Sequence, residues 1–394
     1  MFLKNIKFCR FKGQKYEWSM EGKPLNGVDG QPVAFQEINL VVGKNATGKS
    51  KTIDTIRQLS DLLSGEGRLS QLVYYDTSIY DLLFDDNGNE IAYYLEFEKG
   101  KVKQELLKIN GEEKLKRDSK EGSMFYEKAN TFLEFQMEDD KLAVSRVDSI
   151  QQRFFEPLQN WGKTLSHYRF GGQLGKNSVL RDINAIKEDK EIDLKDSDKV
   201  AEIFFNGEKK FGEPFTNVII ADMKKISYHI SKINVDTLNF FPIPVFGLGV
   251  QEVDIEAVTD QKEMSQGMFR ALSLLVQLNF SLLSKIPSCI LIDDIGEGLD
   301  YERSKSLIDL IIEKVKGSSV QVIMTTNDRF VMNNIPLEYW SVIHRVPKKS
   351  LFYNYQNSKE IFDDFLYSGL SNFDFLRTEF YTTGFDTEEN NEVQ

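Results

Sequence analysis

Cysteine and histidine are scarce in this sequence of 394 residues, which contains two cysteines and three histidines. Cys9 and Cys289 are too few, and too far apart in the sequence, to form a disulfide framework, so we expect a reducing compartment. His167, His229 and His344 lack the spacing of metal ligands. A zinc site and a histidine-based nucleophilic triad are therefore excluded, and with them most hydrolase chemistry.

Long apolar runs and an excess of basic residues are missing too. No stretch approaches the roughly 18 to 20 apolar residues that a membrane helix needs, and the first residues lead into a strand-like pattern without a cleavable signal. The net charge is −12 and the isoelectric point about 5.0. This balance disfavours a protein coated with phosphate-neutralising side chains, although a local basic groove stays possible. We expect a cytoplasmic protein without membrane contact.

The first half of the chain alternates apolar and polar residues, which predicts half-exposed strands. Lys49–Leu63 has apolar residues at helical spacing, and Asp148–Phe170 also looks helical. The polar run at 187–199 is interpreted as a solvated face or loop rather than a binding patch. The predicted strands are Phe2–Phe8, Lys15–Met20, Ala34–Gly43 and a pair that meets at Lys99-Gly100, with a further turn at Asn110-Gly111.

The second half regains order after a charged, mostly helical stretch at 177–232, and an acidic tail, Asp386–Gln394, is predicted to be disordered. Repeats and long heptad runs are absent, which argues against a coiled-coil tether. The predicted helices are Ser265–Leu283, Tyr301–Val315 and Lys359–Tyr367, and the predicted strands are Gln251–Val258, Cys289–Asp294, Val320–Thr326, Trp340–Val346 and Ser350–Tyr355.

A phosphate-binding loop is the strongest motif. A strand precedes it and a helix follows, and a chance match in a chain of this length occurs about one time in a hundred. Its glycines let backbone N–H groups wrap phosphates, Lys49 reaches the β and γ groups, and the Ser50 hydroxyl binds Mg²⁺. The expected nucleotide contacts are Gly43, Lys44, Asn45, Ala46, Thr47, Gly48, Lys49, Ser50 and Lys51.

Two carboxylates follow the apolar run Ile290–Ile292. Any buried strand that meets a turn explains them equally well when they are considered alone. Beside a phosphate loop, Asp293 is expected to hold Mg²⁺. Asp294 is expected to orient the attacking water as the catalytic base, with Lys49 as the second catalytic residue.

Three further positions have both a structural and a functional interpretation. Ser265-Gln266-Gly267 opens a helix and fits a simple N-cap, but it lies where a dimeric ATPase places its signature helix. Asp300 fits an N-cap of the next helix, a role compatible with a place at an interface. Asn327 either contacts the γ-phosphate or caps the helix that Asp328 begins, and capping is slightly favoured.

The order of these motifs resembles the ABC-type ATPase heads of the SMC, RecF and OLD group. EMSQGMFRALSLL is similar to the signature of the AAA_15/AAA_21 branch, in which S-x-G precedes an Arg, here Arg270. LEFEKGKVKQELLKINGE is similar to the strand pair of that branch, whereas LIDDIGEGLDYERSKSLIDLI resembles RecF. The likeness covers about residues 1–110 and 250–330. It implies an α/β fold with a mixed sheet core, an antiparallel β subdomain and a helical insertion.

The resemblance also implies ATP and Mg²⁺ as ligands of a homodimer, or a higher even oligomer, that sandwiches ATP. Ser265 and Gly267 of one subunit would meet the γ-phosphate on the other, and Asp300 would lie near the interface. Most members have Glu where this chain has Asp294, whose side chain is shorter by roughly 1.5 Å. Most also have His where Asn327 stands, and Asn cannot titrate. We therefore predict slow hydrolysis.

Four segments are expected: an N-terminal ATPase lobe at 1–170, a helical insertion at 171–245, a C-terminal ATPase lobe at 246–350 and an extension at 351–394. Gln151 and Gln152 are guesses for the glutamine of the Q-loop. About 65 residues remain after Asn327, fewer than a typical nuclease domain needs.

The favoured function is a regulatory ATPase of a bacterial defence or toxin-like system that acts on a separately encoded effector. The alternative is a RecF-like DNA clamp, based on basic residues at 99–120 and 345–349. An inert structural subunit conflicts with the intact Lys49, Ser50 and Asp293.

Overall fold

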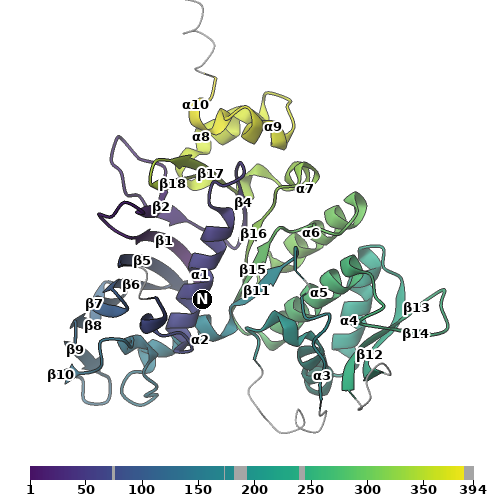
Figure 1. Cartoon of the computed structure of the whole chain (residues 1–394), viewed down its shortest axis with the longest axis horizontal. Helices are drawn as coiled ribbons and strands as arrows, with labels where there is room; N and C mark the ends of the chain where they lie inside the picture. The colour runs from purple at the N-terminus through teal and green to yellow at the C-terminus, as the bar shows by residue number, and fades with distance from the viewer. Residues whose placement is uncertain (73–75, 173, 182–192, 239–244, 386–394) are drawn as a thin grey trace, which may run out of the picture. The chain divides into compact units, whose positions relative to one another are not determined.

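The computed structural model describes residues 1–72, 76–172, 174–181, 193–238 and 245–385. The described chain forms two compact units: Met1–Lys163 with Ile335–Gln394, and Thr164–Asn334 (Figure 1). The predicted C-terminal lobe, 246–350, is therefore divided between them, while the four-part division stays a prediction about functional segments. The acidic tail and residues 187–192 of the polar run at 187–199 lie outside the described residues.

The first unit is built on one extended sheet with the strand order β10-β9-β8-β7-β6-β5-β1-β2-β18-β17-β4, and β3 pairs with β1. From β10 to β2 the neighbouring strands are antiparallel, whereas β18 is parallel to β2 and β17 is parallel to β4. The strands are β1 Phe2–Arg10, β2 Trp18–Gly22, β3 Val33–Ala34, β4 Ile38–Val42, β5 Thr77–Asp86, β6 Asn89–Glu98, β7 Lys101–Ile109, β8 Glu112–Asp118, β9 Glu121–Tyr126, β10 Thr131–Gln136, β17 Trp340–Val346 and β18 Lys349–Asn354.

The helices of the first unit come from both ends of the chain, and α1 buries an apolar face of Ile53, Ile56, Leu59 and Leu63. The spacing of three and four residues between these positions is the one that predicted the helix. The α-helices are α1 Lys49–Ser64, α2 Glu156–Thr164, α8 Tyr355–Leu366, α9 Asn372–Arg377 and α10 Phe380–Thr383.

The second unit has three parallel strands in the order β16-β15-β11, and a separate antiparallel sheet, β12-β13-β14. Its longest helix, α5, lies against α3 and α4. The elements are β11 Ser166–Arg169, α3 Val200–Phe211, α4 Glu213–Lys225, β12 Ile230–Leu238, β13 Val245–Glu252, β14 Val258–Asp260, α5 Gln266–Ser284, β15 Ser288–Asp293, α6 Tyr301–Val315, β16 Val320–Thr325 and α7 Arg329–Asn334.

A buried polar network joins α4, α5 and α6. Asn279 Nδ2 donates to Asp222 Oδ2 at 2.8 Å, and Lys314 Nζ pairs with the same carboxylate at 2.8 Å and donates to Asn279 Oδ1 at 3.0 Å. The carboxylate and the amide are almost fully buried. Because buried polar groups are costly unless all their partners are present, this network fixes how the three helices meet.

The predicted helix Lys359–Tyr367 begins earlier, as Tyr355–Leu366, and the predicted strand Lys15–Met20 is Trp18–Gly22. Two other predicted elements differ more. The helix expected over 148–170 is α2 followed by the strand β11, which is too short to show a period of its own. The strand expected over 251–258 instead runs earlier, as β13, and a turn separates it from β14. Gly247 and Gly249 weaken the sequence signal of β13, but a Cβ on Gly247 would lie 2.6 Å from Gln261 Oε1, so the strand needs glycine there.

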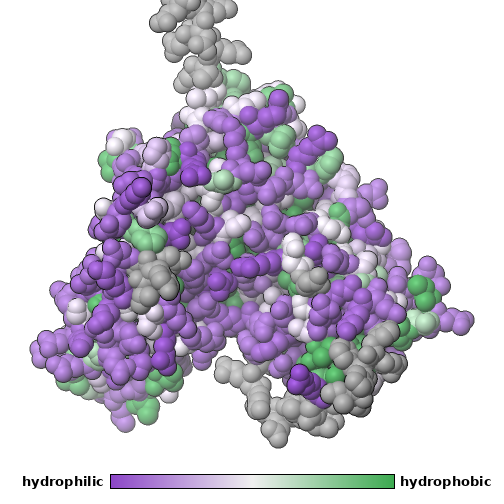
Figure 2. Space-filling model, in the orientation of Figure 1, coloured by the Kyte–Doolittle hydropathy of each residue, from purple (hydrophilic) through white to green (hydrophobic). Residues whose placement is uncertain are grey.

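One helix, α5, is long and apolar enough to cross a membrane by length and composition. However, 83% of that stretch is buried within the protein, as expected for a core helix. The molecular face drawn in Figure 2 is mostly hydrophilic, with small scattered apolar patches.

Candidate functional site

The phosphate loop joins the buried strand β4 to α1, as its motif predicts. Gly48 is the N-cap of α1, with a φ of 117°, and no side chain caps the helix. The first turn of α1 also contains no acidic residue. Its first N–H groups are thus left to carry the positive end of the helix dipole, which is the arrangement that binds phosphate.

Two glycines of the loop stand where a side chain does not fit. A Cβ on Gly43 would lie 2.6 Å from Thr47 Oγ1 and 3.0 Å from Ile343 O, and a Cβ on Gly48 would lie 2.9 Å from Ser350 Oγ. Distances this short force the neighbouring atoms to move. The tight wrapping of the loop therefore depends on glycine at both positions.

Lys49 lies across the loop and is buried. Its Nζ donates to Gly43 O at 2.8 Å and to Lys44 O at 3.4 Å. Asn45 and Ser50 are exposed. The ammonium that is expected to meet the phosphates is therefore held at the centre of the loop, and the Ser50 hydroxyl is accessible for a ligand.

The loop is supported by residues that we did not predict. Trp18 Nε1 donates to Ser350 Oγ at 3.0 Å, and Ser350 Oγ donates to Thr47 O at 2.8 Å. Arg345 Nη1 donates to Ala46 O at 2.9 Å. The only sequence signal is a serine next to the apolar and aromatic residues Leu351, Phe352 and Tyr353, and it does not reveal a partner 303 residues away.

Positive charge gathers around the loop. Burial, with Arg10 and Arg345 nearby, lowers the pKa of Lys51. Lys44 forms an ion pair with Glu379, and its hydrogen bond lowers the pKa of that carboxyl group. The loop therefore offers an anion several cations besides Lys49.

The predicted metal strand, β15, ends at Asp293 in the second unit. Thr325, at the end of the neighbouring strand β16, donates from Oγ1 to Asp293 Oδ1 at 2.6 Å and accepts from the backbone N–H of Asp294 at 3.0 Å. Asp294 has a φ of 56°, a left-handed conformation that Asp tolerates better than most residues. A single threonine thus ties both predicted acidic residues to β16.

Asn327 contacts the predicted base directly. Its Nδ2 donates to Asp294 Oδ1 at 3.3 Å, and the asparagine is exposed. The start of α7 is instead held by Asp328, whose Oδ1 accepts from Phe330 N at 2.7 Å. Of the two interpretations of Asn327, helix capping therefore belongs to Asp328.

The segment Ser265-Gln266-Gly267 opens α5, as predicted. Ser265 is the N-cap, and its Oγ accepts from Met268 N at 3.2 Å. Ser265 and Gln266 are exposed, whereas Gly267 is buried. A Cβ on Gly267 would lie 2.6 Å from Gly298 O and 2.9 Å from the Tyr228 hydroxyl. The glycine therefore lets α5 touch the loop that follows β15.

Arg270, the residue that the resemblance singled out, is 5% exposed and joins two loops. Its Nη1 donates to Glu297 O at 2.7 Å, and its Nη2 donates to Gly172 O at 3.1 Å. These loops follow the parallel strands β15 and β11. Arg270 is thus a structural clamp at the carboxyl ends of the strands, where open α/β sheets bind ligands.

Asp300 is the N-cap of α6. Its Oδ1 accepts from Arg303 N at 2.9 Å, and its Oδ2 pairs with Arg303 Nη1 at 2.6 Å. The backbone N–H of Arg303, followed by its guanidinium, lowers the pKa of Asp300. The Arg303 guanidinium lies over the Tyr228 ring at 4.5 Å. The loop next to the signature helix is therefore ordered by polar contacts.

The guessed Q-loop glutamines lie in the first unit. Gln152 precedes a short 3₁₀ helix, Arg153–Phe155, and is only 1% exposed. In the second unit, the loop after β11 starts beside Asp293, because Phe170 N donates to Asp293 O at 3.0 Å. The glutamine of that loop, Gln173, lies outside the described residues.

The donor set fits Mg²⁺ held mainly by a nucleotide. Among the residues that the structure describes, no group of three or more His, Cys, Asp or Glu side chains can hold a metal ion. Mg²⁺ usually takes only one or two protein oxygens and keeps waters and phosphate oxygens as its other ligands. The Ser50 hydroxyl and the partly exposed Asp293 carboxylate are oxygen donors of that kind.

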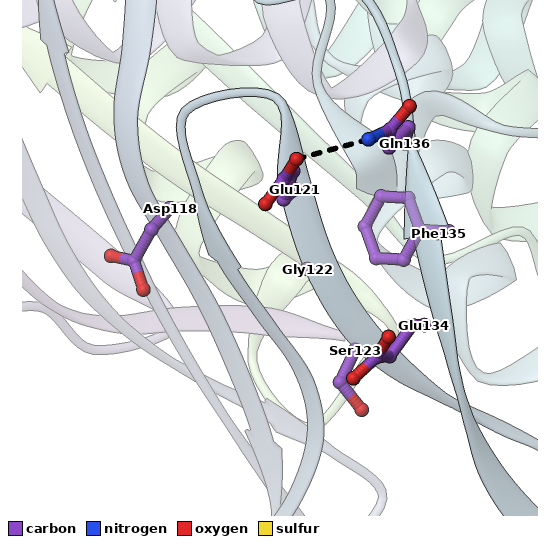
Figure 3. Close-up of a pocket in the computed structure, with 7 residues that line it drawn as sticks. All are labelled: Asp118, Glu121, Gly122, Ser123, Glu134, Phe135 and Gln136. Atoms are coloured by element: carbon purple, nitrogen blue, oxygen red, sulfur yellow. Dashed lines mark hydrogen bonds between the residues drawn. The ribbon is translucent and has the colours of Figure 1, made fainter.

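A hollow of about 670 Å³ lies on the antiparallel strands β8 to β10 (Figure 3). It is lined by Asp118, Glu121 and Glu134, and Gln136 donates to Glu121 Oε1 at 2.9 Å. In the sheet order of the first unit, β10 and β4 lie at opposite ends. This acidic hollow is therefore separate from the phosphate loop, and its charge disfavours phosphate.

A protein-family model, AAA_21, matches residues 38–333 of the chain. Its description is "AAA domain, putative AbiEii toxin, Type IV TA system". The matched stretch contains the phosphate loop, the signature segment, both acidic residues and Asn327. No curated protein sequence matches the chain.

Solved structures with a similar fold are heads of SMC proteins. An SMC head bound to the C-winged helix domain of ScpA is 14% identical, with 89% of this chain and 97% of that chain covered and a TM-score of 0.50. The SMC head domain from Thermotoga maritima is 16% identical, with 89% and 98% covered and a TM-score of 0.43. An SMC head with an extended coiled coil, bound to the C-terminal domain of ScpA derived from Pyrococcus furiosus, is 14% identical, with 93% and 99% covered and a TM-score of 0.49. The predicted α/β fold of an ABC-type P-loop ATPase head is confirmed.

Proposed function

Because the chain belongs to the AAA_21 family, we propose that it binds ATP in the loop Gly43–Ser50 and hydrolyses it slowly. The observation that carries this proposal is the uncapped, acid-free start of α1 behind a loop that only glycine can form at Gly43 and Gly48. Such a helix start is suited to a polyphosphate. Lys49 supplies the central ammonium, and Lys44 and Lys51 add positive charge beside it.

The roles of the remaining residues follow from their chemistry. When bound, Mg²⁺ supplies charge neutralisation for the phosphates, with Ser50 and Asp293 as its protein ligands. Asp294 orients the water that attacks the γ-phosphate. Slow hydrolysis is supported by two features of Asp294: its side chain is short, and Asn327 already donates to its Oδ1. Asn327 cannot titrate, so it adds no second base.

We further propose that ATP joins two copies of this chain. The exposed N-terminus of α5, with Ser265 and Gln266, would face the γ-phosphate bound by the other copy. Helix N-termini favour anions, and the first turn of α5 has no acidic residue to oppose one. Asp300 would lie near the interface. Slow hydrolysis would then make the dimer long-lived.

The biological role that we propose is control of a separately encoded effector, such as a nuclease or a toxin, in a cytoplasmic defence system. The family description, which names a putative toxin of a type IV toxin–antitoxin system, supports a role in such a system. A long-lived, ATP-dependent dimer suits a switch better than a motor. A switch depends on which state the protein occupies, whereas a motor depends on rapid turnover.

The test is phosphate release by the purified chain with ATP and Mg²⁺, together with ATP-dependent co-purification of the products of neighbouring genes. We expect turnover below about 1 s⁻¹, which is slower than the enzyme median of roughly 10 s⁻¹. Lys49→Ala should remove both the turnover and the ATP-dependent complex. Lys128→Ala, a matched loss of an exposed lysine, should change neither.

Turnover of hundreds per second without a partner would contradict the switch. A complex that forms equally well with Lys49→Ala would show that the effector does not respond to ATP. Adjacent replication genes in place of an effector gene would also count against the defence role.

The alternative proposal, a RecF-like DNA clamp, receives little support from the basic residues that suggested it. Arg117 is fully buried and pairs with Glu105 at 3.2 Å. Most of the lysines have a nearby carboxylate, which reduces the charge they offer to DNA phosphates. These pairs are Lys99–Asp76, Lys101–Asp139, Lys103–Glu98, Lys114–Glu112, Lys348–Glu17 and Lys349–Asp29.

A further inference from the structure

Glu379 brings a carboxylate to the phosphate loop. It lies between α9 and α10, 335 residues after its partner Lys44, with which it forms an ion pair. Lys44 directly follows Gly43 in the loop. The two side chains are 59% and 38% exposed, for lysine and glutamate respectively, so the pair is open to solvent and to a ligand.

The backbone at Glu379 is strained and its surroundings hold it in place. Its φ of 56° is a left-handed conformation that costs a residue with a long side chain roughly 1 kcal/mol. Nearby, the Tyr381 hydroxyl and His344 Nδ1 lie 3.2 Å apart, and the rings of Tyr381 and Tyr353 pack with centroids 5.3 Å apart. These contacts attach the segment to β17 and β18. Strain of this kind often marks a switch.

A carboxylate at this position conflicts with the charge of a nucleotide. Phosphates wrapped by the loop would attract the Lys44 ammonium and repel the Glu379 carboxylate. Three other charged groups at the loop, Lys49, Lys51 and Arg345, are cations. An anion in the loop would therefore repel Glu379, whereas the cations around the loop attract it.

We propose that Glu379 is a positioning residue that competes with the ATP triphosphate for Lys44, so that ATP binding releases Glu379 and loosens the C-terminal segment Ser371–Phe385. This inference rests on the proposed binding of ATP to the loop. The segment then differs between the two nucleotide states.

Equilibrium binding of ATP tests the competition. Glu379→Gln keeps the size and an oxygen that can accept a hydrogen bond but removes the charge, and we expect ATP to bind roughly fivefold more tightly than to the unmodified chain. The gain should shrink for ADP and vanish for adenosine, because it depends on phosphate charge. Glu360→Gln, on the exposed side of α8, is the matched control and should bind ATP as the unmodified chain does.

The dependence on Lys44 is tested by a double-mutant cycle. In a Lys44→Gln background, Glu379→Gln should raise the affinity for ATP by less than it does in the unmodified chain, because the competition for Lys44 is gone and only the direct repulsion between carboxylate and phosphates is left to relieve. Amide hydrogen exchange across Ser371–Phe385 reports the second half of the proposal. ATP should speed exchange in the unmodified chain, and in Glu379→Gln exchange should be fast without ATP.

An unchanged or weakened affinity in Glu379→Gln, with normal ATP binding by the unmodified chain, would overturn this inference and leave the proposed function intact. The inference would also be overturned if ATP did not change the rate of amide hydrogen exchange in the C-terminal segment. Failure of the unmodified chain to bind ATP would instead overturn both.

Discussion

At the scale of single residues, the proposed hydrolysis depends on Asp294. Asp294 comes directly after β15 and has a left-handed backbone conformation. Its N–H donates to Thr325, and its carboxylate accepts a hydrogen bond from Asn327. Few residues besides Gly, Asn and Asp adopt this conformation at low cost. The left-handed backbone at this position therefore favours Asp over Glu.

Asp294→Asn is the variant that separates binding from hydrolysis. Asn tolerates the left-handed conformation and keeps an oxygen that can accept from Asn327, but it cannot act as a base. We expect normal ATP affinity and a fall in phosphate release of roughly 100-fold or more. The measurement is single-turnover hydrolysis alongside equilibrium binding.

Asp294→Glu provides the opposite control. It restores the usual length of the base but disfavours the left-handed backbone, so we expect lower stability and no gain in rate. A Glu variant that hydrolyses ATP faster at unchanged stability would show that side-chain length alone limits this site.

Residues within a local motif were predictable, whereas their supports were not. Lys49, Asp293 and Ser265 occupy the predicted places in their elements because each belongs to a short pattern of fixed spacing. Ser350 and Glu379 reach the phosphate loop from more than 300 residues away. Such contacts depend on strand order in the sheet, which a single sequence does not specify.

At the scale of elements, α5 packs closely against the loop after β15 at the signature segment. Gly267 is the point of contact, because a Cβ on that glycine would have Gly298 O, the Tyr228 hydroxyl and Leu299 Cδ2 all within 3.0 Å. Arg270, one turn further along α5, holds the same loop through Glu297 O. The signature helix and the loop before α6 are therefore held together by direct contacts.

Gly267→Ala tests this contact, because the contact predicts a change in the free energy of unfolding that is opposite in sign to the change predicted from helix propensity alone. Ala favours a helix over Gly by about 1 kcal/mol. The contacts should outweigh this gain, and we expect the free energy of unfolding to fall by roughly 1 to 3 kcal/mol in a urea titration. ATP-dependent dimerisation, measured by sedimentation, should also weaken.

The neighbouring substitution Gln266→Ala is the control. Gln266 is exposed in the same turn, so its loss should leave stability nearly unchanged. If Gly267→Ala proved more stable than the unmodified chain, the contact with Gly298 would be easily displaced and would not define the geometry of the segment.

Elements with a strong period were predicted to within a residue or two, and α6 agrees at both ends. The parallel strand β11 was missed, because four residues carry no readable period and its burial comes from pairing with β15. The prediction placed β13 too far towards the C-terminus, because its two glycines are not typical strand residues. The close approach of Gln261 nevertheless requires one of these glycines.

At the scale of the whole molecule, the distribution of charge argues against binding along duplex DNA. The net charge is −12, and lysines that suggested a groove are paired with carboxylates. We expect no salt-dependent retention of duplex DNA by the purified chain, with or without ATP, in a filter-binding or gel-shift titration at low salt.

Retention that appears only with ATP and weakens steeply as salt rises would revive the clamp. In that case Lys103→Glu and Lys349→Glu would distinguish the two basic regions, because each replaces the cation of one ion pair with an anion. A loss of binding in only one variant would locate the DNA-contacting surface.

The support of the phosphate loop by β18 has a consequence for how the protein is made. Thr47 is synthesised 303 residues before Ser350, which accepts from Trp18 and donates to the loop. At roughly 5 to 20 residues per second, the ribosome needs about 15 to 60 s to cover that distance. The nascent chain therefore carries its phosphate loop long before the strand that supports it, and the supported loop forms only after β18 has been translated.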